Sequence, residues 1–178
     1  LPGAHNVENA TAAVLAVSSV VDVPPESIIQ GFASFHGLPH RLRFVAEKNG
    51  VSYYDDSIAT TPGSAIAAIQ SFDQPKILIL GGFDKGADYS KLIELCVEKD
   101  VLIIAMGANR QKIADIAAHK SARIVIVDGG IDEVVTVAAD NAPAGSVVIL
   151  SPAAASFDMF KNYADRGEKF IKAVETLT

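Results

Sequence analysis

The feature that most constrains the fold is an alternation of short aliphatic runs with amphipathic stretches from Pro62 to the end of the chain. The runs predict strands at 76–81, 101–106, 123–127 and 146–150. The stretches between and around them predict helices at 62–71, 88–98, 109–119, 130–141 and 163–177. Short aliphatic runs that alternate with helices are typical of parallel strands buried on both faces. We therefore predict a doubly wound α/β fold, with a mostly parallel sheet and helices on both of its faces.

Two further strands are predicted before this alternation, over 41–47 and 51–55. Asn49-Gly50 lies between them, and this dipeptide favours the positive φ angles of a tight hairpin turn. Gly37-Leu-Pro39 precedes both strands and is typical of a linker. We place a domain boundary there, with residues 1–36 before it and 37–178 after it.

The first part of the chain is predicted to be helical. Apolar residues recur at helical spacing from Val7 to Val21, and Asn6 is the expected N-cap of that helix. A short second helix is expected from Pro25 to Phe32. Because the chain starts at Leu1 and almost inside a helix, we expect it to be a piece of a longer protein.

Composition excludes several classes of function. The net charge of −6 leaves no basic face for a nucleic-acid backbone, so an anionic ligand must be held by a few local cations or N–H groups. The single cysteine, Cys96, is expected in a helix core, and it excludes an internal disulfide, which suits a cytoplasmic protein. No apolar run approaches the roughly 20 residues that span a bilayer, and we expect no signal peptide. We expect a cytoplasmic monomer without membrane insertion.

The segment Gly81-Gly-Phe-Asp-Lys85 follows a predicted buried strand. It matches neither the P-loop pattern nor the dinucleotide-binding glycine pattern. Ligands of doubly wound sheets bind beyond the carboxyl ends of the strands, so the glycines form a turn that delivers Lys85 to that crevice. A solvated loop lysine is the alternative, and the residues alone leave both interpretations open.

The segment Tyr54-Asp-Asp-Ser-Ile-Ala-Thr-Thr-Pro62 ends another predicted strand. Thr61 and Pro62 are typical of a helix start, which explains the segment without any ligand. Alternatively, Asp56 accepts hydrogen bonds from a sugar hydroxyl, and Thr60 lies near an anion at the helix N-terminus. Both interpretations remain open at this stage.

The segment Leu150-Ser-Pro-Ala-Ala-Ala-Ser156 closes the last strand with small residues, which allow a ligand to approach the backbone. Ser156 is expected to donate one hydrogen bond, but no nucleophile elbow surrounds it. The four histidines show no metal spacing or triad pattern, so no catalytic side chain is predicted. Asp165-Arg166 is interpreted as part of a solvated face.

These motifs occur in one order, and together they resemble the Mur ligases of peptidoglycan synthesis. They are Gly3-Ala-His-Asn6, Gly37-Leu-Pro-His-Arg41, Asp56-Ser-Ile-Ala-Thr60, Gly81-Gly82 with Lys85, Leu150–Ser156, Phe160-Lys-Asn-Tyr163 and Arg166-Gly-Glu168. The resemblance covers essentially the whole chain. The segments 37–41 and 150–156 favour the branch of the family that joins D-glutamate to UDP-N-acetylmuramoyl-L-alanine.

The resemblance implies that residues 1–36 end a central ATPase domain and that 37–178 form a Rossmann-like C-terminal domain. The family's P-loop, magnesium-binding acids and carbamylated lysine would lie upstream. ATP and Mg²⁺ are therefore implied as cofactors, with the magnesium ligands outside this chain, and we expect the isolated chain to be inactive. In the family, ATP phosphorylates the acyl carboxylate, and the amino acid's amine attacks the acyl phosphate.

The resemblance also assigns roles to particular residues. Asn6 would face the adenine, Arg41 the ATP phosphates, and Asp56 the ribose. The two carboxylates of D-glutamate would be held by Thr60, Lys85, Ser156 and the backbone of Tyr163. The sequence departs from one common family pattern at Ile58, where a lysine is usual, and at Tyr163, where a phenylalanine is usual. The linker at 37–39 is the expected hinge between the domains.

Two alternatives remain. The first is a non-catalytic nucleotide-binding module of the Rossmann type. The second is a sibling ligase that adds a different amino acid.

Overall fold

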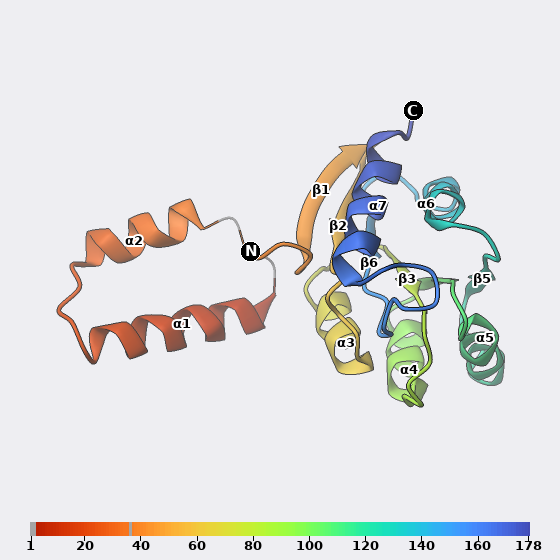
Figure 1. Ribbon diagram of the computed structural model, residues 1–178, viewed down its shortest axis with the longest axis horizontal. Coiled ribbons are helices and arrows are strands. Elements are labelled where there is room, and N and C mark those ends of the chain that lie inside the picture. The colour runs from red at the N-terminus through yellow and green to blue at the C-terminus, as the bar shows by residue number, and fades with distance from the viewer. Residues whose placement is uncertain (1–2, 36) are drawn as a thin grey trace.

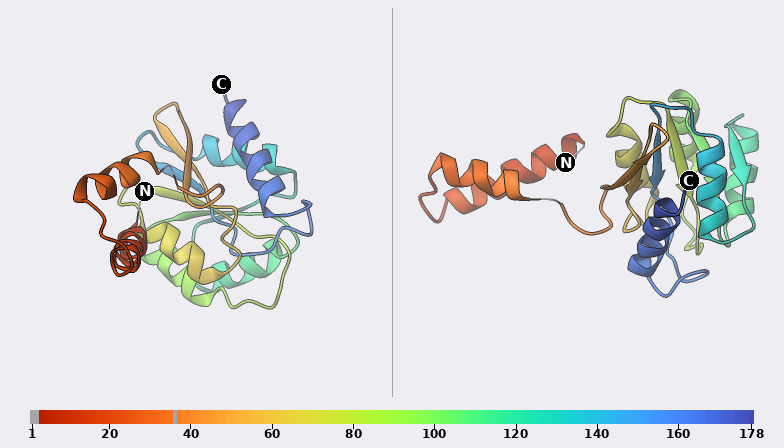
Figure 2. Two further views of the ribbon diagram at one scale, coloured as in Figure 1. Left: turned by 60° about the vertical axis from the view of Figure 1, so that its left-hand side comes forward. Right: turned by 90° about the horizontal axis from the view of Figure 1, so that it is seen from above.

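The computed structural model describes residues 3–35 and 37–178. In it a two-helix arm projects from an α/β domain, as Figure 1 and the right-hand view of Figure 2 show. The arm consists of α1 (Ala4–Ser18) and α2 (Pro25–Ser34). The domain begins after the linker at 37–42 and continues to the end of the chain.

The sheet of the domain has the strand order β1-β2-β6-β3-β4-β5. Its strands are β1 (Arg43–Lys48), β2 (Val51–Asp55), β3 (Lys76–Leu80), β4 (Leu102–Ala105), β5 (Ile124–Ile126) and β6 (Val147–Leu150). Only the edge pair of β1 and β2 is antiparallel, and the other neighbours in this sheet pair in parallel. The prediction of a mostly parallel, doubly wound sheet is confirmed.

Helices cover both faces of this sheet. They are α3 (Pro62–Gln70), α4 (Ser90–Glu98), α5 (Arg110–His119), α6 (Ile131–Asp140) and α7 (Tyr163–Glu175). Alternate side chains of β3 belong to two separate cores. Leu78 and Leu80 pack with α3, α4 and α5, whereas Ile77 and Ile79 pack with α6 and α7. This two-sided burial explains why the strand is aliphatic at every position from Ile77 to Leu80 rather than at alternate ones.

Local chemistry sets two of the predicted features. Asn49 and Gly50 have φ angles of 52° and 75°, as the tight turn between β1 and β2 requires. The side chain of Thr61 accepts a hydrogen bond from the Ser64 N–H, and Pro62 is the first residue of α3. The predicted hairpin and the predicted helix start are therefore both confirmed.

Asn6 is not the N-cap of the first helix, so that prediction is wrong. α1 begins at Ala4, its N-cap is Gly3, and the Asn6 N–H already donates to the Gly3 carbonyl at 3.1 Å. The side chain of Asn6 thus lies within the first turn of α1. The helix also ends at Ser18, where the Ser19 N–H and hydroxyl bond back to carbonyls of its last turn.

Within the described residues, no helix has the length and apolarity that crossing a membrane requires.

Candidate functional site

The central feature of the site is the edge of the sheet at which β2, β6 and β3 end. These strands are neighbours and run in the same direction, so their last residues, Asp55, Leu150 and Leu80, lie along one edge. The loops that follow are the three motif segments of the sequence. The structure therefore brings Asp56, Gly81-Gly82 and Ser151 to the one sheet edge where the sequence predicts a ligand crevice.

Asp56 is buried at this edge and is held by two donors. The Leu42 N–H donates to its Oδ1 at 3.1 Å, and the Ser151 hydroxyl donates to its Oδ2 at 2.7 Å. Burial raises the pKa of Asp56 from 3.8 to about 6, against the lowering effect of these two hydrogen bonds and of Arg41. A carboxylate oxygen can accept more than one hydrogen bond, so Asp56 keeps acceptor capacity beyond these two donors.

Gly81 and Gly82 allow the loops after β3 and β6 to pair closely. The Gly81 N–H donates to the Pro152 carbonyl at 2.8 Å, and the Phe83 N–H donates to the Ala155 carbonyl at 2.9 Å. A Cβ on Gly82 would lie 2.4 Å from the Ala155 carbonyl oxygen, and its φ of 152° is one that other residues rarely adopt. The glycines thus serve a close backbone approach as well as a turn.

Lys85 is exposed on the loop that these glycines open. Its ammonium lies 5.6 Å from the ring centre of Phe157, in the loop after β6. The base of the Lys85 loop is fixed, because Asp84 accepts from the Gly86 N–H at 2.8 Å and from the Lys112 ammonium at 3.0 Å. The loop therefore presents an exposed cation beside the loop that follows β6.

The other predicted carboxylate-binding residues differ in accessibility. Thr60 is exposed and directly precedes the cap of α3, whereas Ser156 is only 3 % exposed. Tyr163 opens α7, and its carbonyl already accepts the Ser57 hydroxyl at 2.7 Å. Its N–H is one of the donors that a helix start leaves without an intrahelical partner. Thr60 and this N–H are therefore better placed for a ligand than the Ser156 hydroxyl.

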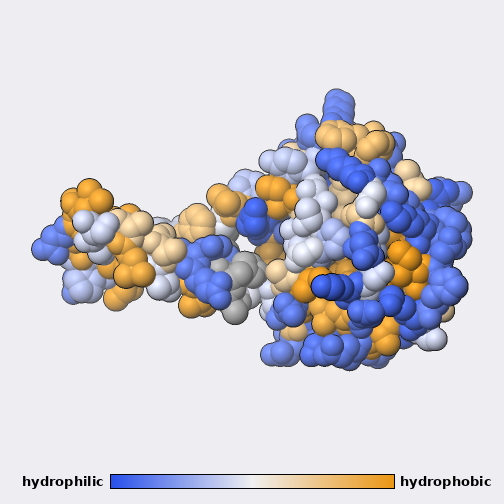
Figure 3. Space-filling view, turned by 90° about the horizontal axis from the view of Figure 1, so that it is seen from below, coloured by the Kyte–Doolittle hydropathy of each residue, from blue (hydrophilic) through white to orange (hydrophobic). Residues whose placement is uncertain are grey.

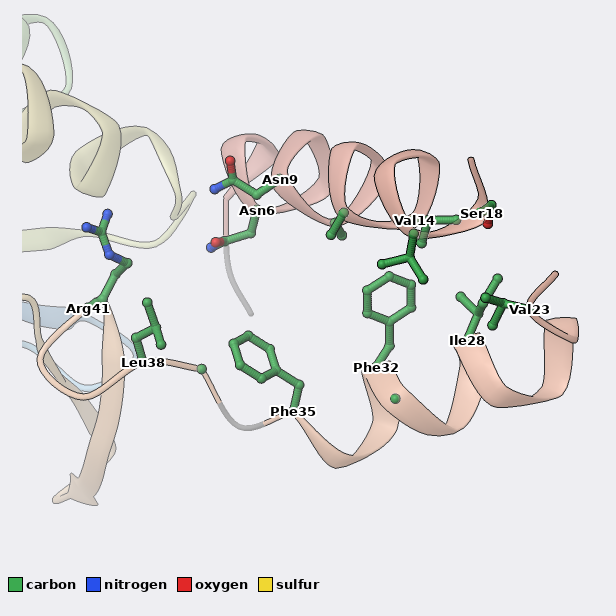
Figure 4. A pocket seen from close by; sticks show the side chains of 15 residues that line it. Asn6, Asn9, Val14, Ser18, Val23, Ile28, Phe32, Phe35, Leu38 and Arg41 are labelled. Carbon is green, nitrogen blue, oxygen red and sulfur yellow. The ribbon is translucent and has the colours of Figure 1, made fainter. Parts of the chain in front are cut away.

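Two cavities lie along the path from the arm, past the linker, to the start of α3. The larger, of about 760 Å³, lies between α1, α2 and the linker, and Asn6 and Arg41 line it together (Figure 4). The smaller, of about 390 Å³, lies beside the start of α3, and Arg41 and Asp56 both line it. Arg41 thus belongs to both cavities. Ile58, at a position where the family pattern usually has a lysine, also lines the smaller cavity. Arg41 is therefore the only cation among the described residues that line this cavity.

Arg166 is a residue whose environment the sequence analysis interpreted wrongly. It is completely buried in α7, not part of a solvated face. Its Nε donates to the Ser57 hydroxyl at 2.9 Å, its Nη2 to the Ser57 carbonyl at 2.8 Å, and its Nη1 to the Ala154 carbonyl at 3.1 Å. These bonds connect α7 to the loops after β2 and β6. Burial lowers the pKa of Arg166 to about 10, so it stays charged at neutral pH.

A periodic signal for Arg166 exists in the sequence. Arg166 precedes Phe170 by four residues, and Phe170 and Val174 form the buried face of α7. Residues four apart share one face of a helix, so the apolar stripe already included Arg166. The preceding Asp165 does lie near solvent, where its carboxylate pairs with Lys169 at 3.2 Å.

His40 and Asp55 form a second buried polar pair that the sequence analysis missed. His40 Nδ1 lies 2.7 Å from Asp55 Oδ2, and Asp55 Oδ1 accepts the Ser57 N–H at 3.0 Å. A carboxylate oxygen accepts, so the imidazole carries its proton on Nδ1. No local pattern marks the pair, because its two members come from the linker and from β2. Within residues 3–35 and 37–178, no cluster of three metal-ligating side chains is found.

The fold is that of a doubly wound α/β domain, with polar loops at the carboxyl ends of β2, β3 and β6, where ligands of such folds bind. The family model described as "Mur ligase, glutamate ligase domain" matches residues 40–154, and the chain belongs to this family. A UDP-N-acetylmuramoylalanine–D-glutamate ligase from Pelotomaculum thermopropionicum is 40 % identical over 177 residues, which cover 99 % of this chain and 39 % of that relative. The relative of the same name from Aquifex aeolicus is 41 % identical over 174 residues, which cover 97 % and 41 %. The chain therefore spans about two fifths of the length of these relatives.

Solved structures show the same fold at lower sequence identity. A UDP-N-acetylmuramate-alanine ligase from Thermotoga maritima has a TM-score of 0.71 at 18 % identity, covering 99 % of this chain and 39 % of that chain. A murein peptide ligase from Psychrobacter arcticus has a TM-score of 0.56 at 16 % identity, covering 100 % and 38 %. At such identities the likeness concerns the fold alone.

Proposed function

We propose that the chain is the C-terminal portion of a UDP-N-acetylmuramoyl-L-alanine:D-glutamate ligase (MurD). The parent enzyme would use ATP to join D-glutamate to the acyl substrate during peptidoglycan biosynthesis in the bacterial cytoplasm. The observation that carries this proposal is the 40 % identity, over 99 % of the chain, to a relative of that name. The proposal is also supported by the motif segments after β2, β3 and β6, which lie at one edge of the sheet.

In this proposal, residues 1–36 end the central ATPase domain and 37–178 form the C-terminal domain. The exposed apolar side chains of the arm support the division, because they are suited to packing against a further part of a domain (Figure 3). Leu15 and Ile29 are two of them, 66 % and 67 % exposed. The linker from residue 37 would then act as the hinge between the two domains.

Asn6, Arg41 and Asp56 would hold ATP. The shared lining of the two cavities supports this role, because Asn6 and Arg41 line one cavity and Arg41 and Asp56 line the other. Arg41 supplies a permanent charge for phosphate, and the Asp56 carboxylate supplies acceptors for ribose hydroxyls. When bound, ATP supplies the phosphoryl group that activates a carboxylate. The ligands of its Mg²⁺ would lie in the preceding part of the parent enzyme.

Lys85, Thr60, Ser156 and the backbone of Tyr163 would hold the two carboxylates of D-glutamate. The position of Lys85 beside the crevice supports this role, and the buried charge of Arg166 adds positive potential below the same loops. The chemistry needs charge neutralisation and a positioned amine, and these side chains provide both without a nucleophile.

Kinetics of the full-length parent enzyme test the D-glutamate site. Lys85→Ala should raise the KM for D-glutamate about 30-fold or more, since it leaves a ligand carboxylate unpaired at a cost of about 2 kcal/mol or more. The KM for ATP should stay nearly unchanged. Lys85→Arg should restore only part of the loss, because a planar fork replaces a compact charge. Lys91→Ala, which removes an exposed lysine of α4, is the matched control. An effect of Lys85→Ala on the ATP KM alone would assign the loop to phosphate.

Asp56→Ala tests the nucleotide site in the same enzyme. Loss of a charged hydrogen bond costs about 1.5–3 kcal/mol, so the ATP KM should rise about tenfold or more. The KM for D-glutamate should change less. Equal changes for both substrates would contradict the ribose role and leave Asp56 as a structural residue of the helix start.

A further inference from the structure

Two residues with unusual backbone conformations flank Arg41 in the linker. His40 and Leu42 have φ angles of 59° and 44°. Residues with a Cβ rarely adopt this left-handed conformation, and they keep it only where the surrounding contacts hold them there. The conformation of both neighbours fixes the direction in which the Arg41 side chain leaves the backbone.

Each strained residue is tied to one of two adjacent carboxylates at the end of β2. The His40 imidazole donates to Asp55 Oδ2 at 2.7 Å, and the Leu42 N–H donates to Asp56 Oδ1 at 3.1 Å. The His40 carbonyl in turn accepts the Ile58 N–H at 3.1 Å. Both ends of the 40–42 segment are thereby bound to the strand end, while Arg41 between them is exposed.

The imidazole of His40 occupies a slot that α7 closes from the other side. The ring of Tyr163 meets it edge-on, with 6.0 Å between the ring centres. A Cβ on Gly167 would lie 2.2 Å from His40 Nδ1 and 2.9 Å from Asp55 Oδ2. The slot therefore exists only because residue 167 lacks a side chain, and Asp55 itself is completely buried.

We propose that His40 and Asp55 are positioning residues, which hold the 40–42 segment in its left-handed conformation and so direct Arg41 into the cavities that it shares with Asn6 and Asp56. This inference rests on the proposed function, in which Arg41 contacts the phosphates of ATP. The pair need not touch the nucleotide. Its effect is to reduce the number of conformations that Arg41 has to abandon when ATP binds.

Amide hydrogen exchange on the 178-residue chain tests the clamp independently of activity. The Leu42 and Ile58 amides should lose about tenfold or more of their protection in His40→Ala, because the left-handed conformation then lacks its tie. His40→Gly should lose less, since glycine adopts positive φ readily. Gly167→Ala should act like His40→Ala by displacing the imidazole. Gly31→Ala is the matched control, because no atom lies within 4 Å of a Cβ added there. Unchanged protection in both His40→Ala and Gly167→Ala would overturn the proposal.

Kinetics of the full-length parent enzyme test the consequence for Arg41. His40→Ala and Asp55→Ala should raise the ATP KM about fivefold or more and leave the D-glutamate KM unchanged. Asp55→Asn should restore part of the loss, because its amide oxygen still accepts from the imidazole. A purely structural role would instead lower kcat and the affinity for both substrates together.

Arg41→Ala is the reference that separates the two possible failures. If Arg41→Ala raises the ATP KM and the His40 and Asp55 variants do not, the positioning role is wrong and the nucleotide role of Arg41 stands. If Arg41→Ala itself leaves the ATP KM unchanged, the nucleotide role is wrong, and the positioning role for ATP fails with it.

Discussion

The arm and the α/β domain share helical apolar patterns but differ in what covers them. In the domain, Leu92 of α4 and Val134 of α6 are completely buried against the sheet. In the arm, none of residues 6–35 is buried, although α1 and α2 carry a comparable share of apolar side chains. Helical periodicity therefore predicts an apolar face, whereas burial of that face depends on a partner element.

The polar groups of the two regions differ in the same way. The domain contains buried polar contacts, such as those of Arg166 and Asp55, that join loops distant in the sequence. The hydroxyls of Thr11 and Ser34 in the arm bond only to carbonyls of their own helix. The domain therefore gains its specificity from tertiary contacts, whereas the described residues of the arm form two helices without a buried core of their own.

The largest expected effect on the free energy of unfolding comes from removing the buried hydrogen bonds of Arg166 in the domain. Arg166→Leu should lower the free energy of unfolding of the chain by about 3–5 kcal/mol, because it deprives the Ser57 and Ala154 carbonyls of their buried donor. Arg123→Leu should change it by about 0.5 kcal/mol or less, since Arg123 pairs with Asp100 in solvent. Urea denaturation measures both. Equal effects of the two variants would contradict the structural role of Arg166.

The difference in burial between the domain and the arm can be tested directly with the same substitution, isoleucine to alanine, in both regions. Ile79→Ala in β3 should lower the free energy of unfolding by about 2–5 kcal/mol, because Ile79 is completely buried and leaves a cavity. Ile29→Ala in α2 should cost about 0.5 kcal/mol or less, because Ile29 is exposed. A large effect of Ile29→Ala would show that the arm has a core of its own in solution.

The pH dependence of stability should report Asp56. Its pKa rises from 3.8 to about 6 on folding, so the native state binds more protons than the unfolded state between these values. Its contribution is therefore fully present below about pH 4 and lost as the pH rises through about 6, by on the order of 2–3 kcal/mol. Asp56→Asn should remove this slope. The measurement is the difference in unfolding free energy between the two proteins from pH 4 to 7, and a constant difference would contradict the burial of this carboxylate.

The smallest expected effect concerns removal of the arm. A chain that starts at residue 37 should unfold within about 0.5 kcal/mol of the full chain, because the residues of both cores lie at or after Leu42. Binding of a hydrophobic dye should fall at the same time, since the exposed apolar residues of α1 and α2 are gone. A loss of stability of more than about 1 kcal/mol would show that the arm packs on the domain.

Most of the fold was predictable because its signals are local. The strand over 51–55 and the helix start at Thr61 depend on residues within a few positions of each other. The crevice was predictable too, since the ends of parallel strands must share an edge. The N-cap of α1 was predicted wrongly because Gly3 and Asn6 both suit a helix start and only the chain geometry distinguishes them.

The alternation of strands and helices, the hairpin, and the chemical types of the residues at the sheet edge are all encoded in short stretches of sequence. These features follow from periodicity and turn chemistry, which act over a few residues. In contrast, the burial of Arg166, the pairing of His40 with Asp55, and the positive φ of His40 and Leu42 depend on contacts that exist only in the folded domain. The environment of a charged or strained residue is set by the segments that pack on it, and these come from distant parts of the chain. Arg166 meets Ser57, 109 residues away, because the fold places α7 against the loop after β2.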